Sequence, residues 1–312
     1  MTSHTTGRSA AGRSARTTIA RRRARVSGLP GLAFIAPALV GLLALYILPL
    51  LTTVYLSFTE TKPFGGETFT GIDNYAALVA DPQFWNALRN SAIYTAIVLL
   101  GIPISIVIAT LIHAVRRGKN VYRVLFFLPI VTLPVAVGMV WRYIFNGEFG
   151  LLNQALGVVG IDGPSWVADP SVAIFAVSIV GIWMSLGTSI IILGAGLQGV
   201  PPELLEASAL DGAGPVRQFF AVTLPLLSPS IFFVSVLSVI SSLQMFDLIY
   251  VMLIRGSQAE TASQTIVYYF FQQTFVRFDR GYGSAIAIVL LLLIMLVTAV
   301  QFRLQRKAVF YG

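Results

Sequence analysis

The sequence predicts an all-α membrane protein that crosses the bilayer several times, and both its composition and its pattern of apolar segments indicate this class. Of the 312 residues, 56% are hydrophobic and only 11% are charged, whereas about 25% of the residues of a typical soluble domain are charged. Six apolar segments, separated by polar stretches, each approach or exceed the roughly 20 residues that a helix needs to cross a bilayer. A polytopic membrane protein with six transmembrane helices is therefore expected.

The expected spans divide the chain into a tail, a separate first helix and a helical core. They lie at residues 29–58, 89–113, 122–145, 172–197, 222–247 and 284–303. The chain accordingly divides into a terminal tail (1–28), a first transmembrane helix (29–58), a loop (59–88), a core of five transmembrane helices (89–305) and a C-terminal end (306–312). Each boundary falls where apolar sequence gives way to charged or turn-forming residues.

The tail carries most of the excess positive charge. The whole chain has a formal net charge of +8, and the tail alone contains Arg8, Arg13, Arg16, Arg21, Arg22, Arg23 and Arg25. Because the rest of the chain is nearly balanced, this charge does not indicate a folded nucleic-acid-binding surface, and no nucleic-acid partner is expected. Its low hydrophobicity predicts a disordered cytoplasmic segment beside anionic lipid headgroups.

A cleaved signal peptide is the alternative interpretation of the N-terminal region, since basic residues there precede an apolar run. The run from Leu29 to Phe58 is about twice as long as the apolar region of a signal peptide, and it has no obvious small-residue cleavage site. A retained first transmembrane helix is therefore predicted.

The charges of the loops predict the orientation of the chain. The loops at 59–88 and 146–171 are acidic, with Glu60, Glu67, Asp73, Asp81, Glu148, Asp162 and Asp169 against the single base Lys62. The tail, the loop at 114–123 and the C-terminal end are basic; outside the tail the bases are Arg116, Arg117, Lys119, Arg123, Arg303, Arg306 and Lys307. Because basic loops favour the cytoplasmic side, both termini and the segment 198–221 are expected inside the cell.

The segment from Pro201 to Pro225 is unusually polar for a stretch between two apolar spans. Pro201 and Pro202 suit the first turn of a helix, where a missing N–H costs little. Asp211 and Gly212 predict the end of that helix, because glycine readily adopts the left-handed conformation of a C-cap. A second short helix is expected to begin at Gly214, so the segment forms two short helices with a bend. An ordinary capped corner between two membrane helices is the alternative.

This segment resembles the EAA signature of permease subunits of ATP-binding-cassette (ABC) importers. The matching residues are Glu206, Ala207, Ser208, Asp211, Gly212, Ala213, Phe219, Leu224 and Pro225, with Ser208 in place of the second alanine. In that family the loop, here 198–221, is a coupling helix that seats in the ATP-binding subunit. The resemblance therefore implies that Glu206, Ala207, Ser208, Asp211, Gly212, Ala213, Phe219 and Pro225 contribute to coupling with an ATPase, and that the fold is that of a type I ABC importer permease.

Other segments resemble the carbohydrate-uptake branch of these permeases, which includes maltose and glycerol-phosphate types. They are Asn74–Tyr75, Asp81–Trp85, Asn90–Ser91 with Tyr94–Thr95, Phe145–Asn146, Gly150–Asn153 and Phe246–Tyr250. After Tyr250 the family usually has a threonine and a glycine-glycine-proline turn, whereas this chain has Leu253 to Gln258 without that pattern. The family's detailed contacts with an external binding protein are therefore not carried over to this turn.

Polar residues within the fourth and fifth spans are candidates for a substrate path. The set comprises Trp183, Ser185, Thr188, Ser238, Ser242, Gln244 and Asp247. Intramembrane polar groups usually face a cavity or another helix, and a neutral sugar would use hydroxyl, amide and aromatic partners of this kind. The alternative for the serines is that they only permit close helix packing.

Two spans carry matching prolines, with Pro129 and Pro134 in one and Pro225 and Pro229 in the other. Proline removes a helical hydrogen bond and bends the helix, so both pairs are candidate hinges. Ordinary kinked packing is an equal alternative, because proline is frequent in membrane helices.

Several kinds of chemistry are absent from the sequence. There is no G-x-x-x-x-G-K-[ST] loop for ATP, no H-E-x-x-H zinc site, no cysteine and no hydrolytic constellation. The sequence therefore predicts no catalytic residues, no cofactor and no metal site, and any energy for transport must come from a partner.

The resemblance implies the pore subunit of an ABC importer in the bacterial cytoplasmic membrane. Its implied partners are a second permease subunit in a heterodimer, two ATP-binding subunits, an external solute-binding protein, a sugar substrate and membrane lipids. A neutral di- or oligosaccharide is the expected substrate, with glycerol phosphate or another small polar solute as the alternative. An ion-coupled secondary transporter would need charged residues deep in several spans, and only Arg142 and Asp247 qualify, both near outer ends.

Overall fold

The structure is a computed structural model that describes residues 28–62, 66–115 and 117–308. The chain separates into two compact units, residues 1–50 and 51–312, which are described individually below. The basic tail expected at 1–28 lies almost entirely outside the described residues. Within them the chain is predominantly helical, as predicted, with one two-stranded hairpin of β1 (Thr59–Thr61) and β2 (Glu67–Phe69), antiparallel with Thr59 opposite Phe69.

The first unit contains α1 (Gly28–Leu42), the π-helical turn η1 (Leu43–Ile47) and the start of α2 (Leu48–Leu56). Residues Phe34–Leu56 form an apolar helix of 23 residues, which confirms that the predicted first span is helical and long enough to cross a bilayer.

A proline explains why the helix widens at η1. Proline at position i clashes with the carbonyl of residue i−4 and lacks the N–H that would bond to it. Just before Pro49, the N–H of Leu48 bonds to the carbonyl of Leu43, five residues back. The same pattern recurs before Pro225, where the N–H of Leu224 bonds to the carbonyl of Phe219 at η2. In both places the helix accommodates the ring by one wide turn rather than by ending.

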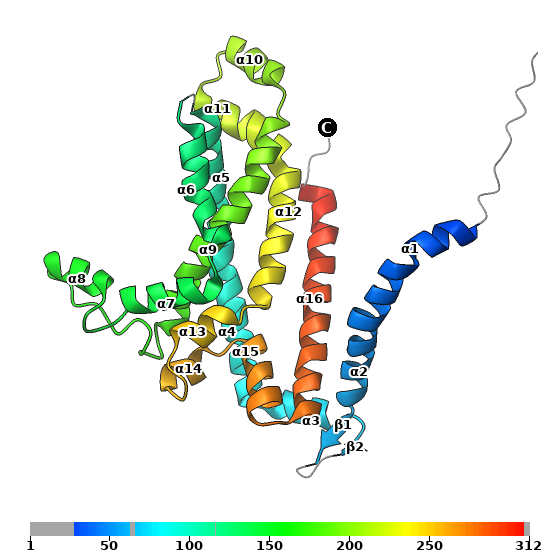
Figure 1. The fold of residues 1–312 in the computed structure, drawn as a ribbon. Helices are drawn as coiled ribbons and strands as arrows, with labels where there is room; N and C mark the ends of the chain where they lie inside the picture. Colours follow the sequence, from blue (N-terminus) through cyan, green and yellow to red (C-terminus); the bar gives the residue numbers. More distant parts are fainter. Residues whose placement is uncertain (1–27, 63–65, 116, 309–312) are drawn as a thin grey trace, which may run out of the picture. The chain divides into compact units, whose positions relative to one another are not determined.

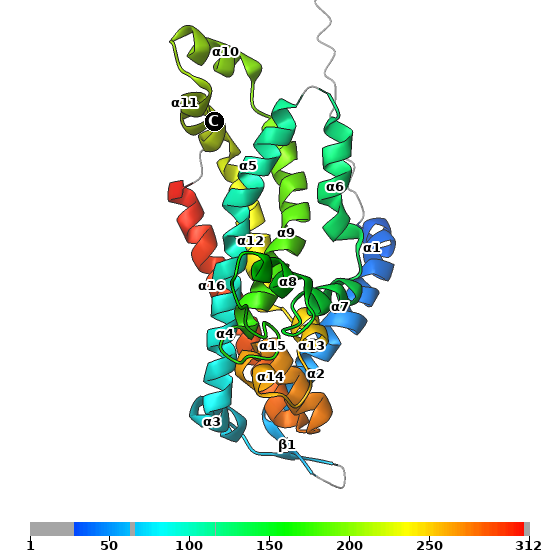
Figure 2. The ribbon, with the colours of Figure 1, turned by 90° about the vertical axis from the view of Figure 1, so that its left-hand side faces the viewer.

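The second unit contains the remaining helices, which Figure 1 shows in sequence colours. They are α3 (Asp73–Ala80), α4 (Pro82–Leu99), α5 (Gly101–Ala114), α6 (Lys119–Val131), α7 (Pro134–Ile144), α8 (Leu151–Val158), α9 (Ala173–Gln198), α10 (Pro202–Leu210), α11 (Pro215–Gln218), η2 (Phe219–Thr223), α12 (Leu224–Leu243), α13 (Asp247–Met252), α14 (Gln258–Ser263), α15 (Ile266–Phe271), η3 (Gln272–Val276) and α16 (Arg280–Ala308). Within this unit, α10 and α11 lie at one end, and α3, α14 and α15 lie toward the other, in both Figure 1 and Figure 2.

Five described helices are long and apolar enough to cross a membrane, and the predicted third span is a sixth only if a broken pair is counted as one. Its two parts, α6 and α7, meet at a bend of 105° between Val131 and Pro134. Thr132 and Leu133 have extended backbone, with ψ angles of 141° and 128°. A residue before proline is pushed out of the helical region, which explains why Leu133 leaves the helix. The expected continuous helix over 122–145 is therefore broken at the predicted hinge.

The other span boundaries differ from expectation by a few residues. The second span begins at Pro82 rather than near 89, because Asp81 caps α4 by accepting the N–H of Gln83 at 2.8 Å. The fifth begins at Pro215, since α11, η2 and α12 form one continuous helix to Leu243. Pro229 lies inside α12 without interrupting it.

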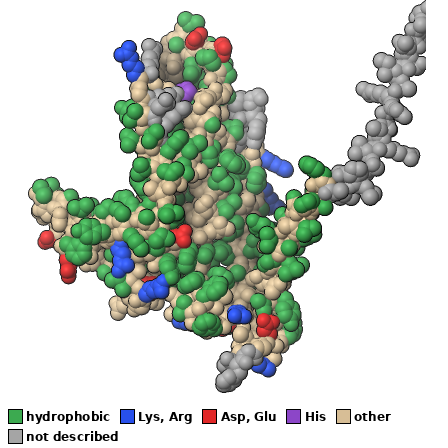
Figure 3. All heavy atoms as spheres, viewed as in Figure 1, with side chains coloured by type: hydrophobic (Ala, Val, Ile, Leu, Met, Phe, Trp, Pro, Cys, Tyr) green, Lys and Arg blue, Asp and Glu red, His purple; other side chains and the backbone are tan. Residues whose placement is uncertain are grey.

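Helix α9 is the centre of the second unit and packs against α4, α5, α6 and α12. Small residues permit this approach. A Cβ atom at Gly181 would lie 2.3 Å from the hydroxyl of Tyr94 in α4, and one at Gly196 would lie 2.3 Å from the Oγ of Ser230 in α12. Hydrophobic side chains cover much of the stretch between the two ends of the unit in Figure 3, as expected for helices that face lipid or another subunit.

Candidate functional site

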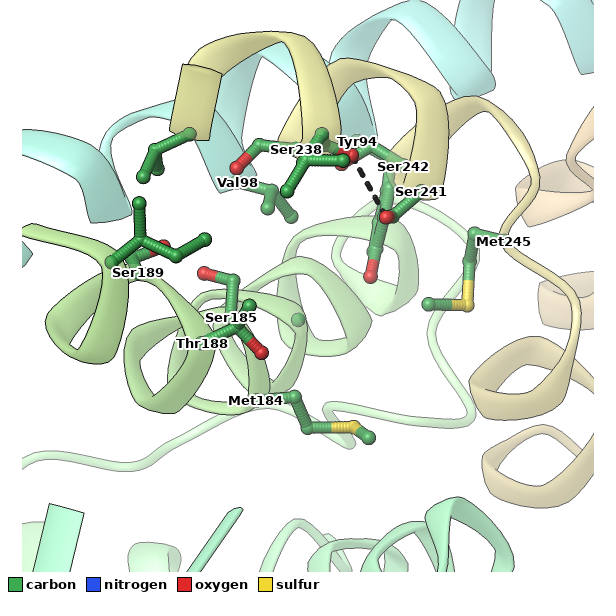
Figure 4. Close-up of a pocket in the computed structure, with 14 residues that line it drawn as sticks. Tyr94, Val98, Met184, Ser185, Thr188, Ser189, Ser238, Ser241, Ser242 and Met245 are labelled. Atoms are coloured by element: carbon green, nitrogen blue, oxygen red, sulfur yellow. Dashed lines mark hydrogen bonds between the residues drawn. The ribbon is translucent and has the colours of Figure 1, made fainter. Parts of the chain in front are cut away.

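A cavity of about 240 Å³ lies between α4, α9 and α12. Its hydroxyl groups come from two helical stripes and from α4: Ser185, Thr188 and Ser189 on α9, Ser238, Ser241 and Ser242 on α12, and Tyr94 on α4. Figure 4 shows the two serine-bearing helices facing each other across the cavity. Residues at i, i+3 and i+4 share one face of a helix, so these spacings alone bring the hydroxyls together.

Some of these hydroxyls donate hydrogen bonds to backbone carbonyls, and others are free to bind a ligand. Ser185 donates to the carbonyl of Ile182 at 2.8 Å, and Ser241 donates to that of Leu237 at 2.8 Å. Within the described part of the chain, no hydrogen bond engages the hydroxyls of Thr188, Ser238 or Ser242. Since a polar group in an apolar environment favours having a partner, these three are suited to bind a hydroxylated ligand.

The remaining lining of the cavity is apolar and uncharged. Val98, Met184, Ile192, Val234, Leu237 and Met245 supply aliphatic and thioether surface, and no described residue that lines the cavity carries a charge. Methionine adapts to irregular apolar shapes. The cavity therefore combines neutral hydrogen-bonding groups with apolar faces and offers no electrostatic partner for an ion.

Four of the predicted path residues line this cavity, namely Ser185, Thr188, Ser238 and Ser242, and three do not. The ring of Trp183 lies 6.1 Å from that of Trp141 and packs at the edge of a buried core cluster. Gln244 is the exposed C-cap of α12, and Asp247 is exposed at the start of α13. The cavity also contains Tyr94, Ser189 and Ser241, which are not in the predicted path set. Ser189 and Ser241 are polar residues of the same two spans, and they extend the stripes of Ser185 and Ser238.

The second candidate region is the exposed pair α10 and α11 at one end of the second unit. Gly212 has a φ angle of +78°, as expected for a C-cap glycine. The N–H of Ala213 donates to the carbonyl of Ser208 at 3.0 Å, and the N–H of Gly212 donates to that of Ala209 at 3.0 Å. This pair of bonds is a Schellman motif, and it turns the chain sharply after α10.

A side chain from α11 holds the two short helices together. The amide of Gln218 donates to the carbonyl of Ala213 at 3.0 Å and lies 3.5 Å from that of Leu205. Phe219 packs against the buried cluster formed by α5, α9 and α12, and Pro225 lies in the first turn of α12, which leads to the cavity. The exposed region is thus joined to the transmembrane core through one continuous helix.

The outer surface of α10 presents the residues identified from the sequence. Glu206, Ala207, Asp211 and Gly212 are exposed, while Ser208 and Ala213 are half-buried, the Ser208 hydroxyl donating to the carbonyl of Leu205 at 2.9 Å. Leu210 is 90% exposed and Val216 is 72% exposed. Exposed apolar side chains beside acidic ones are typical of a surface that binds another protein.

Comparison with known proteins decides the family. The model of the binding-protein-dependent transport system inner membrane component matches residues 101–309. This chain belongs to that family of ABC transporter permease subunits. Its members are membrane subunits without enzymatic activity, so the chain is a transporter component rather than an enzyme.

Individual relatives match over nearly the whole chain. The probable ABC transporter permease protein YesP of Bacillus subtilis is 35% identical over 299 residues, which cover 93% of this chain and 94% of YesP. The sulfoquinovosyl glycerol transport system permease protein SmoG of Agrobacterium fabrum is 34% identical over 276 residues, which cover 87% of this chain and 89% of SmoG. The resemblance to permeases of the carbohydrate-uptake branch is therefore confirmed.

A solved structure shows the same fold. A chain of the bacterial ABC transporter for the acidic polysaccharide alginate superimposes with a TM-score of 0.80, at 20% identity, and covers 90% of this chain and 96% of that one. The fold predicted from the coupling segment, that of an ABC importer permease, is confirmed.

Proposed function

We propose that this chain forms one half of the membrane channel of an ATP-driven importer and passes a saccharide into the cell through the cavity between α4, α9 and α12. The observation that carries this proposal is the set of available hydroxyls on Thr188, Ser238 and Ser242 in an uncharged cavity. A sugar ring presents hydroxyls at its edge and C–H groups on its faces, which match the serine stripes and the apolar lining respectively.

A neutral di- or oligosaccharide fits this cavity better than glycerol phosphate. A phosphate group would favour basic partners, and none lines the cavity. Relatives are named for both kinds of substrate, such as the arabinooligosaccharide permease AraP and the sn-glycerol-3-phosphate permease UgpA. Their names support a sugar or sugar-like solute, and the uncharged lining favours the neutral class.

The proposed assembly pairs this chain with a second, different permease subunit, two ATP-binding subunits and an external solute-binding protein. In this proposal both termini and α10 lie in the bacterial cytoplasm, because the basic loops favour that side. The alginate transporter of similar fold was solved in complex with an alginate pentasaccharide-bound periplasmic protein, which supports an external binding protein as a partner. Hydrolysis of ATP takes place in the partner subunits.

In this assembly α10 and α11 seat in the ATP-binding subunit. Glu206 makes a charge-assisted contact with a basic group there, and the exposed small and apolar residues around it allow close approach. Movement of α10 reaches the cavity through η2 and α12, because these form one continuous helix with α11.

Uptake by the reconstituted complex tests the cavity. Ser238→Ala and Ser242→Ala each remove one hydroxyl; a neutral hydrogen bond contributes about 0.5–1.5 kcal/mol, so uptake of a neutral saccharide should fall up to about tenfold. Ser235→Ala is the matched control, since Ser235 lies on α12 outside the cavity and donates to the carbonyl of Phe232 at 2.7 Å. Maltose, arabinotriose and sn-glycerol 3-phosphate are the probes. Unchanged uptake of every transported probe in both variants, or transport of the phosphate alone, contradicts the assignment.

A further inference from the structure

The turn that departs from the family pattern forms a ridge between two clefts. This ridge, residues Ile254–Ser257, leads into α14. Arg255 and Gly256 line a cavity of about 370 Å³, and Gly256 and Ser257 line one of about 560 Å³. Gln83, Gly256 and Thr261 line both cavities. The ridge lies toward the end of the second unit opposite α10 in Figures 1 and 2, so it is external when α10 is cytoplasmic.

The smaller cleft contains two arginines without acidic partners. The guanidinium carbon of Arg255 lies 4.2 Å from the centre of the Tyr250 ring, a cation–π contact that holds it in place. Arg277 lines the same cleft and lies 3.5 Å from the amide oxygen of Gln273. Both arginines are exposed, and within the described part of the chain neither forms an ion pair.

Among the described residues that line this cleft, Glu260 carries the one carboxylate, and it already bonds to other residues of the cleft. Glu260 is only 4% exposed and accepts hydrogen bonds from the backbone N–H of Gly256, the hydroxyl of Tyr268 and, at 3.0 Å, the amide of Gln272. These bonds fix the turn that presents Arg255. A buried carboxylate with several donors is a rigid structural element. Because Glu260 already has these partners, an acidic group from outside can still pair with the arginines.

The segment that follows the ridge, from the end of α14 to Thr265, is hydrogen-bonded directly to elements of the transport cavity. The buried hydroxyl of Thr265, just after α14, donates to the carbonyl of Met245 at 2.7 Å, and Met245 lines the cavity. The buried amide of Asn90 in α4 donates to the carbonyls of Ala262 at 2.6 Å and Gln264 at 3.0 Å. Tyr94, one turn further along α4, lines the cavity as well.

We propose that Arg255 and Arg277 receive an acidic patch of the external solute-binding protein, and that Thr265 passes this docking to the transport cavity through Met245. The inference rests on the proposed function and assigns the contact to Arg255, which lies in the turn that departs from the family pattern, and to Arg277, which is the C-cap of η3. A protein is the expected partner because its surface can contact the ridge and both clefts together, whereas a small ion would need only the arginines. Complementary charges would raise the association rate and make docking sensitive to salt.

Docking is tested with the complete complex in lipid nanodiscs and the solute-binding protein that stimulates its ATP hydrolysis. Arg255→Glu and Arg277→Glu should each weaken its binding about tenfold or more and reduce the dependence of Kd on salt. Lys62→Glu is the control, because Lys62 is another base of the external loops and lines neither cleft; it shares a third cavity with Arg277 but not with Arg255. Its Kd should stay within about twofold of the unmodified complex. Unchanged Kd in both arginine variants overturns the proposal.

Transmission is tested separately from docking. Thr265→Val removes the hydroxyl at nearly constant volume, and it should preserve the Kd for the solute-binding protein while reducing its stimulation of ATP hydrolysis several-fold. Thr265→Ser keeps the hydroxyl and should restore the stimulation. Equal stimulation in both variants contradicts the role of Thr265, and low stimulation in Thr265→Ser despite normal docking does so as well.

Two further outcomes separate this inference from its alternatives. If free digalacturonate binds the complex, and Arg255→Glu abolishes that binding without changing docking, the cleft is an acidic-saccharide site and the docking proposal is wrong. If the complex couples ATP hydrolysis to saccharide uptake but the arginine variants dock normally, the proposed function stands and this inference fails. A complex without coupled uptake contradicts the proposed function instead.

Discussion

The hydroxyl of Tyr269 donates a hydrogen bond to the carboxylate of Asp81, which lies 188 positions earlier in the chain. The hydroxyl of Tyr282 donates to the same oxygen at 2.6 Å, and the other oxygen accepts the backbone N–H of Gln83 at 2.8 Å. One side chain thereby joins the first turns of α4 and α16 to α15 at the end of the unit remote from α10.

These contacts shift the pKa values of Asp81 and Tyr269, which both lie outside the membrane spans. Partial burial tends to raise the pKa of Asp81, but hydrogen bonds from Tyr269, Tyr282 and the backbone of Gln83 and Phe84 outweigh it, so its pKa lies below the ordinary value. Burial, with the bond to Asp81, raises the pKa of Tyr269 to about 12. At neutral pH Asp81 is therefore ionised and Tyr269 is protonated, as the hydrogen bond between them requires.

Asp81→Asn should destabilise the protein at neutral pH by about 1–2 kcal/mol, because it replaces a charged acceptor of two hydroxyls by a neutral amide. Asparagine is also a good N-cap, so the loss reports the tyrosine bonds rather than the cap. Thermal unfolding in detergent measures it. Since the pKa of Asp81 is lowered on folding, its contribution is complete above the unfolded value of about 3.9 and is lost as pH falls through the lower folded value. The difference between the two proteins should therefore shrink only in strong acid; a constant difference down to that range contradicts the account.

The glycines of α9 provide a matched pair for packing. Gly196→Ala should destabilise the protein, because the new Cβ would lie 2.3 Å from Ser230 Oγ and 2.8 Å from a methyl group of Leu227. Gly194→Ala meets nothing within 4 Å and should be neutral or stabilising by about 0.5–1 kcal/mol, the gain of alanine over glycine in a helix. Unfolding temperatures of the two variants measure this contrast. Equal temperatures would mean that α9 and α12 can separate without cost.

Local signals in the sequence predicted local structure well. Gly212 between Asp211 and Ala213 predicted a left-handed C-cap, and its φ angle of +78° agrees, because a C-cap depends on a few neighbouring residues. Pro134 marked the break of the third span, but not its angle of 105°. That angle depends on packing between α7 and α13, which are far apart in the sequence.

Contacts between distant segments could not be predicted in this way. The bond between Asp81 and Tyr269 depends on where α4 and α15 meet, and no periodicity encodes that. In the same way, a polar residue within a span predicts a cavity or a partner without saying which. Ser238 and Ser242 line the cavity, whereas Gln244, two residues further on, is the exposed cap that ends α12. Its role in the substrate path stays a prediction.

Cysteine labelling tests the predicted orientation, because the chain has no cysteine of its own. Arg117→Cys and Glu203→Cys should react with an impermeant maleimide only after the cells are opened, and Val159→Cys should react in intact cells. All three positions are exposed, so failure to react reports the side of the membrane rather than burial. Labelling of Val159→Cys only in opened cells would overturn the six-span arrangement.

The strongest prediction concerns the bend between α10 and α11. Gly212→Val places a β-branched residue at a φ angle of +78°, which costs a non-glycine residue roughly 1–2 kcal/mol and a branched one more. A Cβ there meets nothing within 4 Å, so the cost is one of backbone conformation and should open the Schellman motif. Gly214→Val is the matched control, since Gly214 is equally unobstructed but has an ordinary φ angle of −70°. Gly212→Val should lose co-purification of the ATP-binding subunit and the stimulation of ATP hydrolysis by the solute-binding protein, while Gly214→Val keeps both.

Glu206→Lys should impair co-purification and stimulation more than Glu206→Ala, because a like charge in the groove adds repulsion to the lost hydrogen bond. Normal values in Gly212→Val and Glu206→Lys would mean that this segment is only a corner between two helices.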